Sequence, residues 1–208
     1  MKHHTDKAYR HGYAQVYERI LGPKKQSLTV VMELGVLSGG SLRMWREWLP
    51  RNVTLVGVDY DTRKLEDLRA SGLNSDSNVF LVQADQTNGT EMDALVKQWQ
   101  PDVFLEDGCH RERCQQLTMS FVIPRMKTGA VYIVEDLHPC DYKHQKECSN
   151  PRTYDILRRI EAQTTNHPSS VCISNMGSLI RSVKNMTIWS KPGCGTCCTS
   201  TTALLQLA

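Results

Sequence analysis

Residues 28–49 read LTVVMELGVLSGGSLRMWREWL, an apolar and β-branched run followed by a glycine-containing turn and an amphipathic segment. The run at 28–34 lacks the alternation of a half-exposed strand, which is typical of a strand covered on both faces. After the glycines, Leu42, Trp45 and Leu49 recur at helical spacing. A strand, a turn and a helix in this order indicate the first βα unit of a parallel sheet.

The same pattern repeats at intervals of about 25 residues, which suits a strand, a helix and two short loops. The other apolar runs are VTLVGVD at 53–59, VFLVQAD at 79–85, VFLED at 103–107 and AVYIVED at 130–136. Helices are expected around 92–99, 111–125 and 151–160. The alternation predicts an α/β, Rossmann-like fold with a doubly wound, mostly parallel sheet and helices on both faces. The stretches 171–174 and 186–190 are expected to add an antiparallel C-terminal hairpin.

The composition is typical of a globular protein, with 208 residues of which 40% are apolar and 23% charged. We expect a single domain over 1–191, beginning with a helical segment at 1–27, and a disordered Cys-rich tail at 192–208. No apolar stretch reaches the roughly 18 residues of a membrane span, and no secretory signal is evident. A cytoplasmic location and no membrane partner are therefore expected. The net charge of +3 gives no indication of a nucleic-acid partner.

The chain contains eight cysteines, but a domain of this size does not need a disulfide framework. Five of them are scattered, and three crowd the tail; in order they are Cys109, Cys114, Cys140, Cys148, Cys172, Cys194, Cys197 and Cys198. A single C-x-x-C without a second ligand pair is weak evidence for zinc. We expect a reduced tail, and the role of its cysteines stays open.

Acidic residues directly end or follow all five predicted strands. In an open parallel sheet, ligands bind outside the carboxyl ends of the strands. Carboxylates gathered there repel one another, which favours a cation, or a ligand rich in hydroxyl and amino groups, among them. The acidic residues are Glu33, Asp59, Asp85, the pair Glu106 and Asp107, and the pair Glu135 and Asp136.

The turn after the first predicted strand, ELGVLSGGS at 33–41, has features of a nucleotide site. Its glycines let the backbone approach a ligand, and the following helix start offers free N–H groups. Leu37 stands where the dinucleotide fingerprint G-x-G-x-x-G has its second glycine, which disfavours a pyrophosphate ligand. Asp59 is placed to bind a ribose diol, of NAD or S-adenosylmethionine equally, and Asp85 an adenine amine. Taken singly, each acid is explained equally well as a cap of the next helix.

The fourth and fifth strand ends read EDGCH at 106–110 and VEDLH at 134–138. Several hard oxygen ligands beside two histidines favour Mg²⁺ or Mn²⁺ over zinc. Consecutive strand residues point to opposite faces, so Glu135 and Asp136 can share one metal only if the strand has already ended. The alternative is that these acids cap helices and pair with nearby basic side chains; the candidates are Arg111, Arg113 and Lys143.

Several stretches together resemble a known family. They are TDK at 5–7 followed by His11, Tyr13 and YER at 17–19, MELGVLSGGSLRMWREWLP at 32–50, VGVDYD at 56–61, ADQTN at 84–88, EDGCH at 106–110 and YIVEDLHP at 132–139. In order and spacing, the chain resembles metal-dependent O-methyltransferases of the macrocin and mycinamicin type. These class I enzymes transfer the methyl group of S-adenosylmethionine to macrolide deoxysugars. The resemblance covers nearly all of residues 5 to 139.

The resemblance implies roles residue by residue. The implied cofactor-binding residues are Glu33, Gly35 and Ser41 at the methionine end, Asp59 at the ribose, and Asp85 with Gln86 near the adenine. Asp107, Glu135 and Asp136 would hold Mg²⁺ or Mn²⁺, and either His110 or Asp107 would be the general base. The metal would favour ionisation of an acceptor hydroxyl, from which the base takes the proton.

The chain also departs from the family. Glu106 stands where the family usually has Asp, Cys109 where it usually has Ser, and 137–150 does not look like the family's acceptor-covering loop. The implied function is methylation of a hydroxyl on a sugar or glycosylated small molecule. The alternatives are a catechol or other vicinal diol as acceptor, or a non-catalytic domain that binds S-adenosylmethionine. A homo-oligomer is possible, and the acceptor hydroxyl stays unidentified.

Overall fold

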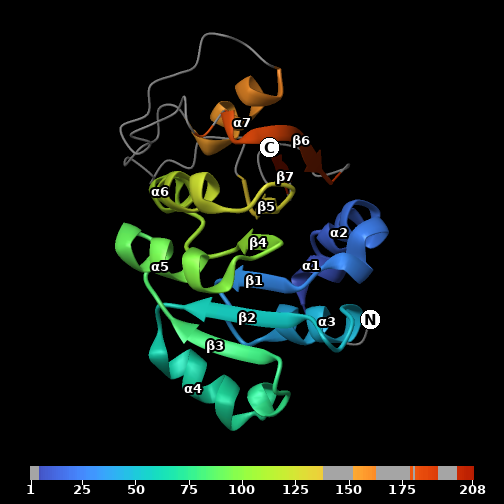
Figure 1. The fold of residues 1–208 in the computed structure, drawn as a ribbon, viewed down its shortest axis with the longest axis vertical. Coiled ribbons are helices and arrows are strands. Elements are labelled where there is room, and N and C mark those ends of the chain that lie inside the picture. Colours follow the sequence, from blue (N-terminus) through green and yellow to red (C-terminus); the bar gives the residue numbers. More distant parts are fainter. Residues whose placement is uncertain (1–4, 138–151, 163–178, 180, 192–200) are drawn as a thin grey trace.

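The computed structural model describes residues 5–137, 152–162, 179, 181–191 and 201–208, and these form one α/β unit (Figure 1). Its seven-stranded sheet has the order β3-β2-β1-β4-β5-β7-β6. The parallel strands are β1 (Val30–Leu34), β2 (Thr54–Asp59), β3 (Val79–Gln83), β4 (Val103–Glu106) and β5 (Val131–Val134). The predicted doubly wound, mostly parallel sheet is therefore confirmed.

Helices cover both faces of this sheet. In the chain, α1 (Asp6–Tyr9) and α2 (Tyr13–Leu21) precede β1. One helix follows each of the strands β1 to β4, in the order α3 (Gly40–Trp48), α4 (Thr62–Ala70), α5 (Gly89–Trp99) and α6 (Glu112–Val122). The last helix, α7 (Thr153–Glu161), comes between β5 and β6. Short 3₁₀ turns follow at Gly22–Ser27, Leu73–Ser75 and Ile123–Arg125. Side chains of α2, α3 and α4 pack on one face, and those of α5, α6 and α7 on the other.

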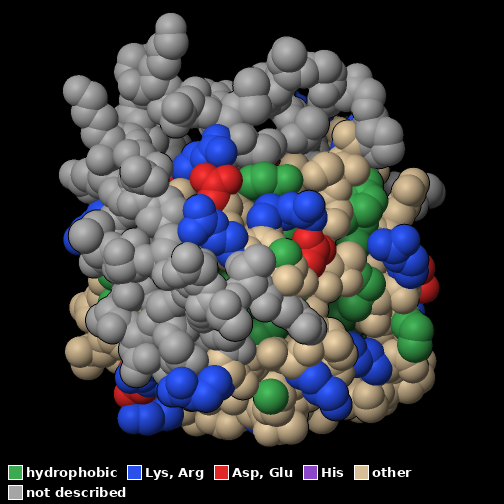
Figure 2. All heavy atoms as spheres, turned by 90° about the horizontal axis from the view of Figure 1, so that it is seen from above, with side chains coloured by type: hydrophobic (Ala, Val, Ile, Leu, Met, Phe, Trp, Pro, Cys, Tyr) green, Lys and Arg blue, Asp and Glu red, His purple; other side chains and the backbone are tan. Residues whose placement is uncertain are grey.

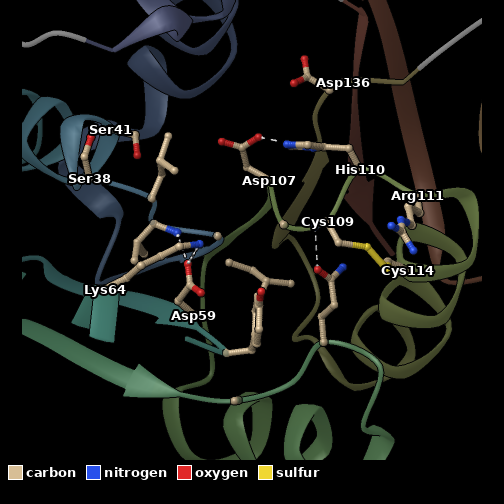
Figure 3. Close-up of a pocket in the computed structure, with 18 of the residues that line it drawn as sticks. Ser38, Ser41, Asp59, Lys64, Asp107, Cys109, His110, Arg111, Cys114 and Asp136 are labelled. Carbon is tan, nitrogen blue, oxygen red and sulfur yellow. Dashed lines mark hydrogen bonds and ion pairs between the residues drawn. A yellow bond between two sulfur atoms is a disulfide. The ribbon is translucent and has the colours of Figure 1, made fainter. Parts of the chain in front are cut away.

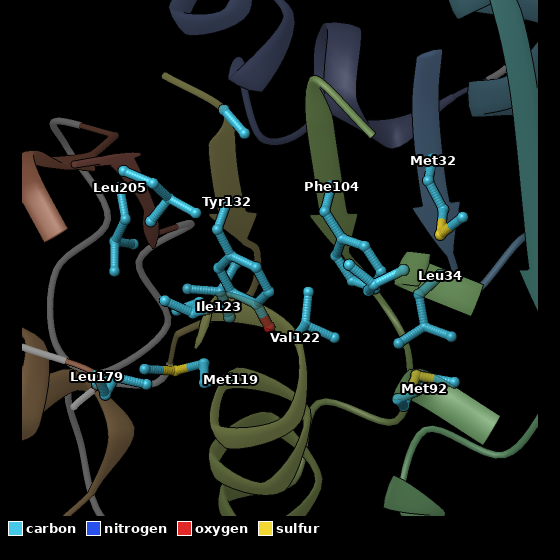
Figure 4. Close-up of a cluster of buried hydrophobic side chains, with 14 of the residues drawn as sticks. Met32, Leu34, Met92, Phe104, Met119, Val122, Ile123, Tyr132, Leu179 and Leu205 are labelled. Atoms are coloured by element: carbon cyan, nitrogen blue, oxygen red, sulfur yellow. The ribbon is translucent and has the colours of Figure 1, made fainter. Parts of the chain in front are cut away.

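The strands are apolar on both faces, as their continuous apolar runs predict. On β4, Phe104 faces the α5–α7 side, while Leu105 faces the α2–α4 side. Phe104 stacks on Tyr132 of β5, with ring centroids 5.5 Å apart, and α6 closes over them (Figure 4). Burial on both faces holds the central strands rigidly, so their carboxyl ends form a fixed platform.

The C-terminal residues correct the expected disordered tail. Thr201–Leu207 forms β7, which pairs antiparallel with β5 on one side and with β6 (Val183–Ser190) on the other. The apolar residues of β7 explain this position, because Leu205 packs on one face of the sheet and Leu204 on the other. The expected antiparallel pair is present, but its second strand is β7. The stretches 171–174 and 192–200 lie outside the described residues.

The carboxyl ends of β1, β2, β3, β4 and β5 meet at one edge of the sheet (Figure 1). On the face that Figure 2 shows, basic side chains lie beside acidic ones, and hydrophobic side chains form small groups. Among the described residues, no helix has both the length and the apolar character that crossing a bilayer requires.

Gly35 fixes the approach of the first turn to the loop after β4. Its φ is +88°, and a Cβ there would lie 2.1 Å from the carbonyl oxygen of Asp107. We expect Gly35→Ala to lower the free energy of unfolding by about 3 kcal/mol, because left-handed strain adds to the clash. Gly72→Ala, at φ +75° with nothing within 4 Å, should cost only about 1 kcal/mol. Urea denaturation measures both, and equal losses would contradict the close approach.

Candidate functional site

A cavity of about 730 Å³ opens at the carboxyl ends of the parallel strands. Its walls come from the loops after all five of these strands and from the N-terminal residues 5–7 (Figure 3). Eight of the residues predicted from the sequence line it: Gly35, Ser41, Asp59, Asp85, Gln86, Asp107, His110 and Asp136. The other two, Glu33 and Glu135, are buried behind the wall of the cavity.

Lys7 of α1 holds those two buried acids. Its ammonium nitrogen forms ion pairs with Asp107 Oδ2, with Glu135 Oε2 at 2.5 Å and with Glu33 Oε1 at 3.4 Å. Lys7 is only 1% exposed. Burial alone would lower the pKa of Lys7, but the surrounding carboxylates outweigh it and hold that pKa well above its usual value. Lys7 is therefore a permanent cation at the acidic strand ends.

Two tyrosines of α2 bind the consecutive acids that follow β5. The Tyr17 hydroxyl donates to Glu135 Oε1, and the Tyr13 hydroxyl donates to Asp136 Oδ1 at 2.8 Å. Burial, and then the nearby carboxylates, raise the pKa of both tyrosines, so they remain donors. β5 ends at Val134, and Asp136 has a φ of +51°. The strand has thus ended before this pair, as a shared metal site would need, yet the two carboxylates have different partners.

Asp107, His110 and Asp136 form the acidic end of the cavity. One potential ligand atom of each lies within 4.8 Å of the others. Asp107 uses Oδ2 for Lys7, while its Oδ1 lies 3.9 Å from His110 Nδ1, too far for a hydrogen bond. His110 Nδ1 is buried and has no hydrogen-bond partner among the described residues. The two carboxylates suit a hard divalent cation such as Mn²⁺ or Mg²⁺.

The opposite end of the cavity is formed by Asp59 and the turn after β1. Asp59 is buried; its Oδ2 accepts a hydrogen bond from the Val36 N–H at 3.2 Å, and its Oδ1 accepts one from the Asp61 N–H at 3.0 Å. Lys64 Nζ lies 3.5 Å from Asp59 Oδ2. These contacts fix the carboxylate at the cavity wall. Asp85 lies on the exposed rim, where its Oδ1 accepts from the backbone and hydroxyl of Thr87.

Gln86 braces the loop after β4. Its Nε2 donates to Glu106 Oε1 at 3.0 Å and to Thr118 Oγ1 at 3.1 Å, and its Oε1 accepts from the Cys109 N–H at 2.9 Å. Burial, followed by the charge of Asp107, raises the pKa of Glu106 to about 7. Gln86 therefore joins β3, β4 and α6 behind the cavity in addition to lining it.

Sequence reasoning missed the partners that organise these acids. Lys7, Tyr13 and Tyr17 lie in the N-terminal segment, far along the chain from the strand ends that they contact. The repulsion among the acids does predict a cation, and the four-residue spacing of the tyrosines places them on one helix face. A disulfide joins Cys109 to Cys114, and nothing in the scattered cysteine spacing indicates that pairing.

No family model matches the chain, but curated relatives do. It is 30% identical over 145 residues to an 8-demethyl-8-α-L-rhamnosyl tetracenomycin-C 2′-O-methyltransferase of Streptomyces olivaceus, over 66% of this chain and 36% of that protein. It is 25% identical to mycinamicin VI 2″-O-methyltransferase of Micromonospora griseorubida, over 62% and 32% respectively. The chain thus spans about a third of the length of these relatives. The resemblance to sugar O-methyltransferases of the macrocin and mycinamicin type is confirmed.

Solved structures share the fold. The MycE methyltransferase of the mycinamycin biosynthetic pathway, in complex with Mg, SAH and mycinamycin VI, matches with a TM-score of 0.71 at 18% identity, over 96% of this chain and 50% of that one. The O-methyltransferase TomG from Streptomyces achromogenes, in complex with SAM, matches with a TM-score of 0.57 at 12% identity, over 95% and 80%. These matches confirm the Rossmann-like fold.

Removing the Lys7 ammonium should destabilise the protein strongly. Lys7→Met keeps the length of the side chain but leaves three carboxylates without their buried cation. We expect the free energy of unfolding at pH 7.5 to fall by about 3–5 kcal/mol. Lys184→Met on the exposed part of β6 is the matched control, with an expected change within about 0.5 kcal/mol. Equal losses for both variants in urea denaturation would contradict a central role for Lys7.

Glu33 should make stability depend on pH. Burial, opposed by Lys7 and assisted by Asp107, raises the pKa of Glu33 from 4.5 to about 7. Since the folded state holds the proton more tightly, the resulting stability is fully present below pH 4.5 and is lost as the pH rises through about 7. Wild type should lose about 2–3 kcal/mol relative to Glu33→Gln over this range.

The exposed Glu66→Gln variant is the matched control, and its stability should follow that of wild type at every pH. The measurement is urea denaturation at half-unit pH steps for all three proteins. Parallel curves for wild type and Glu33→Gln would show that Glu33 does not bind this proton in the folded state.

Proposed function

We propose that this chain carries an S-adenosylmethionine-dependent, Mg²⁺- or Mn²⁺-assisted O-methyltransferase activity toward a hydroxyl of a sugar or glycosylated small molecule. One observation carries the proposal: a single cavity joins a diol-binding carboxylate, Asp59, to the acidic group of Asp107, His110 and Asp136. Asp59 suits the ribose of a nucleoside, and the acidic group suits a divalent cation next to the acceptor hydroxyl. Names of the relatives support the sugar as acceptor.

The cofactor would lie along the turn after β1. Gly35 lines the cavity where this turn packs closely against the loop after β4, and Ser41 belongs to the first turn of α3 at the cavity wall. Asp59 is held rigidly and is ready to accept hydrogen bonds from both hydroxyls of a ribose. The carboxylates at the acidic end of the cavity, Asp107 and Asp136, also favour the positively charged sulfonium of the cofactor.

The residues at the acidic end fit a divalent cation. Asp107 Oδ1 and Asp136 offer hard oxygen donors at one place, with the imidazole of His110 beside them, whereas Glu135 is already bound by Lys7 and Tyr17. We therefore propose Asp107 and Asp136 as the carboxylate ligands, with Glu135 acting through Lys7. A bound Mg²⁺ would supply Lewis-acid assistance to ionisation of the acceptor hydroxyl.

His110 is the stronger of the two candidate bases. The imidazole of His110 lines the cavity and forms no side-chain hydrogen bond through Nδ1 with the described residues, so the ring is available to accept a proton from an acceptor hydroxyl there. Asp107 already uses one oxygen for Lys7. Alignment of the acceptor oxygen with the methyl group of the sulfonium would supply much of the remaining rate enhancement. Assembly as a homo-oligomer and a cytoplasmic location stay predictions.

Calorimetric titration with S-adenosylmethionine, with and without Mg²⁺ and with NAD as the control, tests the proposal. Binding of S-adenosylmethionine but not NAD, followed by Mg²⁺-dependent methylation of a deoxysugar glycoside, is the expected result. Binding without transfer to any glycoside or catechol would favour a non-catalytic domain. A folded protein that does not bind S-adenosylmethionine would overturn the proposal.

Asp136→Asn tests the metal ligands. The variant loses one anionic donor, so its affinity for Mn²⁺ should fall by about 10–100-fold, with a parallel loss of Mg²⁺-dependent methyl transfer. Affinity for S-adenosylmethionine should change by less than about twofold, since Asp59 and Gly35 are untouched. The exposed Asp67→Asn on α4 is the matched control. Unchanged Mn²⁺ binding by Asp136→Asn would remove Asp136 from the metal site.

His110→Ala tests the base. Turnover should fall by about 10²–10⁴-fold, while thermal stability and cofactor affinity stay close to those of wild type. Rates are measured under saturating S-adenosylmethionine and Mg²⁺, so that a weaker metal affinity does not limit them. An unchanged turnover would transfer the role of base to Asp107.

A further inference from the structure

The Cys109–Cys114 disulfide encloses His110 in a short covalent loop. The bridge spans five positions of sequence and joins the loop after β4 to the first turn of α6. Both cysteines line the cavity together with His110 and Arg111, and the sulfur–sulfur bond lies beside them in Figure 3. The link is therefore part of the cavity wall that presents His110.

His110 depends on its backbone for its position. Its φ is +54°, in the left-handed region that costs a residue with a side chain about 1 kcal/mol or more. In the part of the chain that the structure describes, no hydrogen bond to its Nδ1 fixes the ring. Arg111, the N-cap residue of α6, makes no side-chain capping hydrogen bond. Cys109 restrains one end of this segment through its N–H bond to Gln86 and through the disulfide, and the Gln115 N–H bond to the Arg111 carbonyl at 3.0 Å restrains the other end.

We propose that the Cys109–Cys114 disulfide is a redox-sensitive positioning element that holds His110 against Asp107 and Asp136. This inference rests on the proposed function, because it assigns the disulfide to the metal-binding and proton-accepting end of that site. In the oxidised protein the covalent loop keeps the imidazole within reach of both carboxylates. Breaking the bond frees the segment to leave the left-handed conformation, and His110 moves away from them.

A dithiol reductant can reach this bond from the cavity. Cys109 is exposed and Cys114 is half-buried, so a thiolate attacks the Cys109 sulfur, breaks the bond to Cys114 and forms a mixed disulfide. Cys114 leaves as a thiolate and takes up a proton. The second thiol of the reductant then displaces Cys109 as the reductant closes to its own disulfide. Two electrons pass from the dithiol to the protein, which gains two thiols.

The test compares oxidised and dithiothreitol-reduced wild type with the double variant Cys109→Ser/Cys114→Ser. Peptide mapping of the oxidised protein first identifies the cross-link. The readouts are Mn²⁺ affinity by electron paramagnetic resonance, and kcat and KM for methyl transfer. Since the double variant retains the other six cysteines, an effect of reductant on them would appear in both proteins.

Reduction of wild type should weaken Mn²⁺ binding by about tenfold and lower kcat by a similar factor. KM for S-adenosylmethionine should stay within about twofold, because Asp59 and Gly35 lie at the other end of the cavity. The double variant should have the Mn²⁺ affinity and kcat of reduced wild type, and dithiothreitol should change neither value. Each single Ser variant should behave like the double variant, because either one abolishes the bond.

Several outcomes would overturn the inference: free Cys109 and Cys114 thiols in the oxidised protein, equal Mn²⁺ affinity in both redox states, or a reductant effect that persists in the double variant. A single Ser variant with wild-type properties would also do so. If the protein binds no S-adenosylmethionine in either state but its Mn²⁺ affinity still follows the disulfide, the proposed function fails and the positioning role survives.

Discussion

One buried ammonium ion organises the acidic end of this sheet. Lys7 reaches carboxylates carried by three neighbouring strands or the residues just after them: Glu33 of β1, Asp107 after β4 and Glu135 after β5. Buried carboxylates at such spacing repel one another and resist ionisation. A single cation among them relieves that repulsion and at the same time ties α1 to the centre of the sheet. The positions of Glu33, Asp107 and Glu135 at the acidic end follow from this arrangement.

The same arrangement divides the acids between two tasks. Lys7 and Tyr17 bind Glu135 behind the wall, whereas Asp136 has a left-handed backbone, faces the cavity and accepts a hydrogen bond from Tyr13. Asp107 lies at the boundary, with one oxygen toward Lys7 and the other toward His110. Because Lys7 neutralises the buried Glu33 and Glu135, Asp107 and Asp136 at the cavity wall remain available to a ligand. Residues of the N-terminal segment thus decide which carboxylates the cavity presents.

The regular part of the fold follows from local sequence patterns. Continuous apolar runs at regular spacing predict the parallel strands, and the acids after them predict where a ligand binds, because both depend on residues close in the chain. The contacts of Lys7 and the placement of β7 depend on residues far apart in sequence, which periodicity does not report. The tail shows this best: its cysteines suggested disorder, yet Ala203 and Leu205 complete a sheet whose edge the earlier residues leave open.

The insertion of β7 between β5 and β6 sets an order of events during synthesis. Val134 of β5 pairs with Ala203, which the ribosome adds about 70 residues later, a delay of several seconds at ordinary rates of translation. During that interval the outer edge of β5 has unpaired N–H and C=O groups, open to association with other strands. The Leu137 N–H, just beyond Asp136, also awaits its acceptor on Thr201. The nascent chain therefore contains nearly all of its cavity residues before β7 can pair with β5 and stabilise the sheet that carries them.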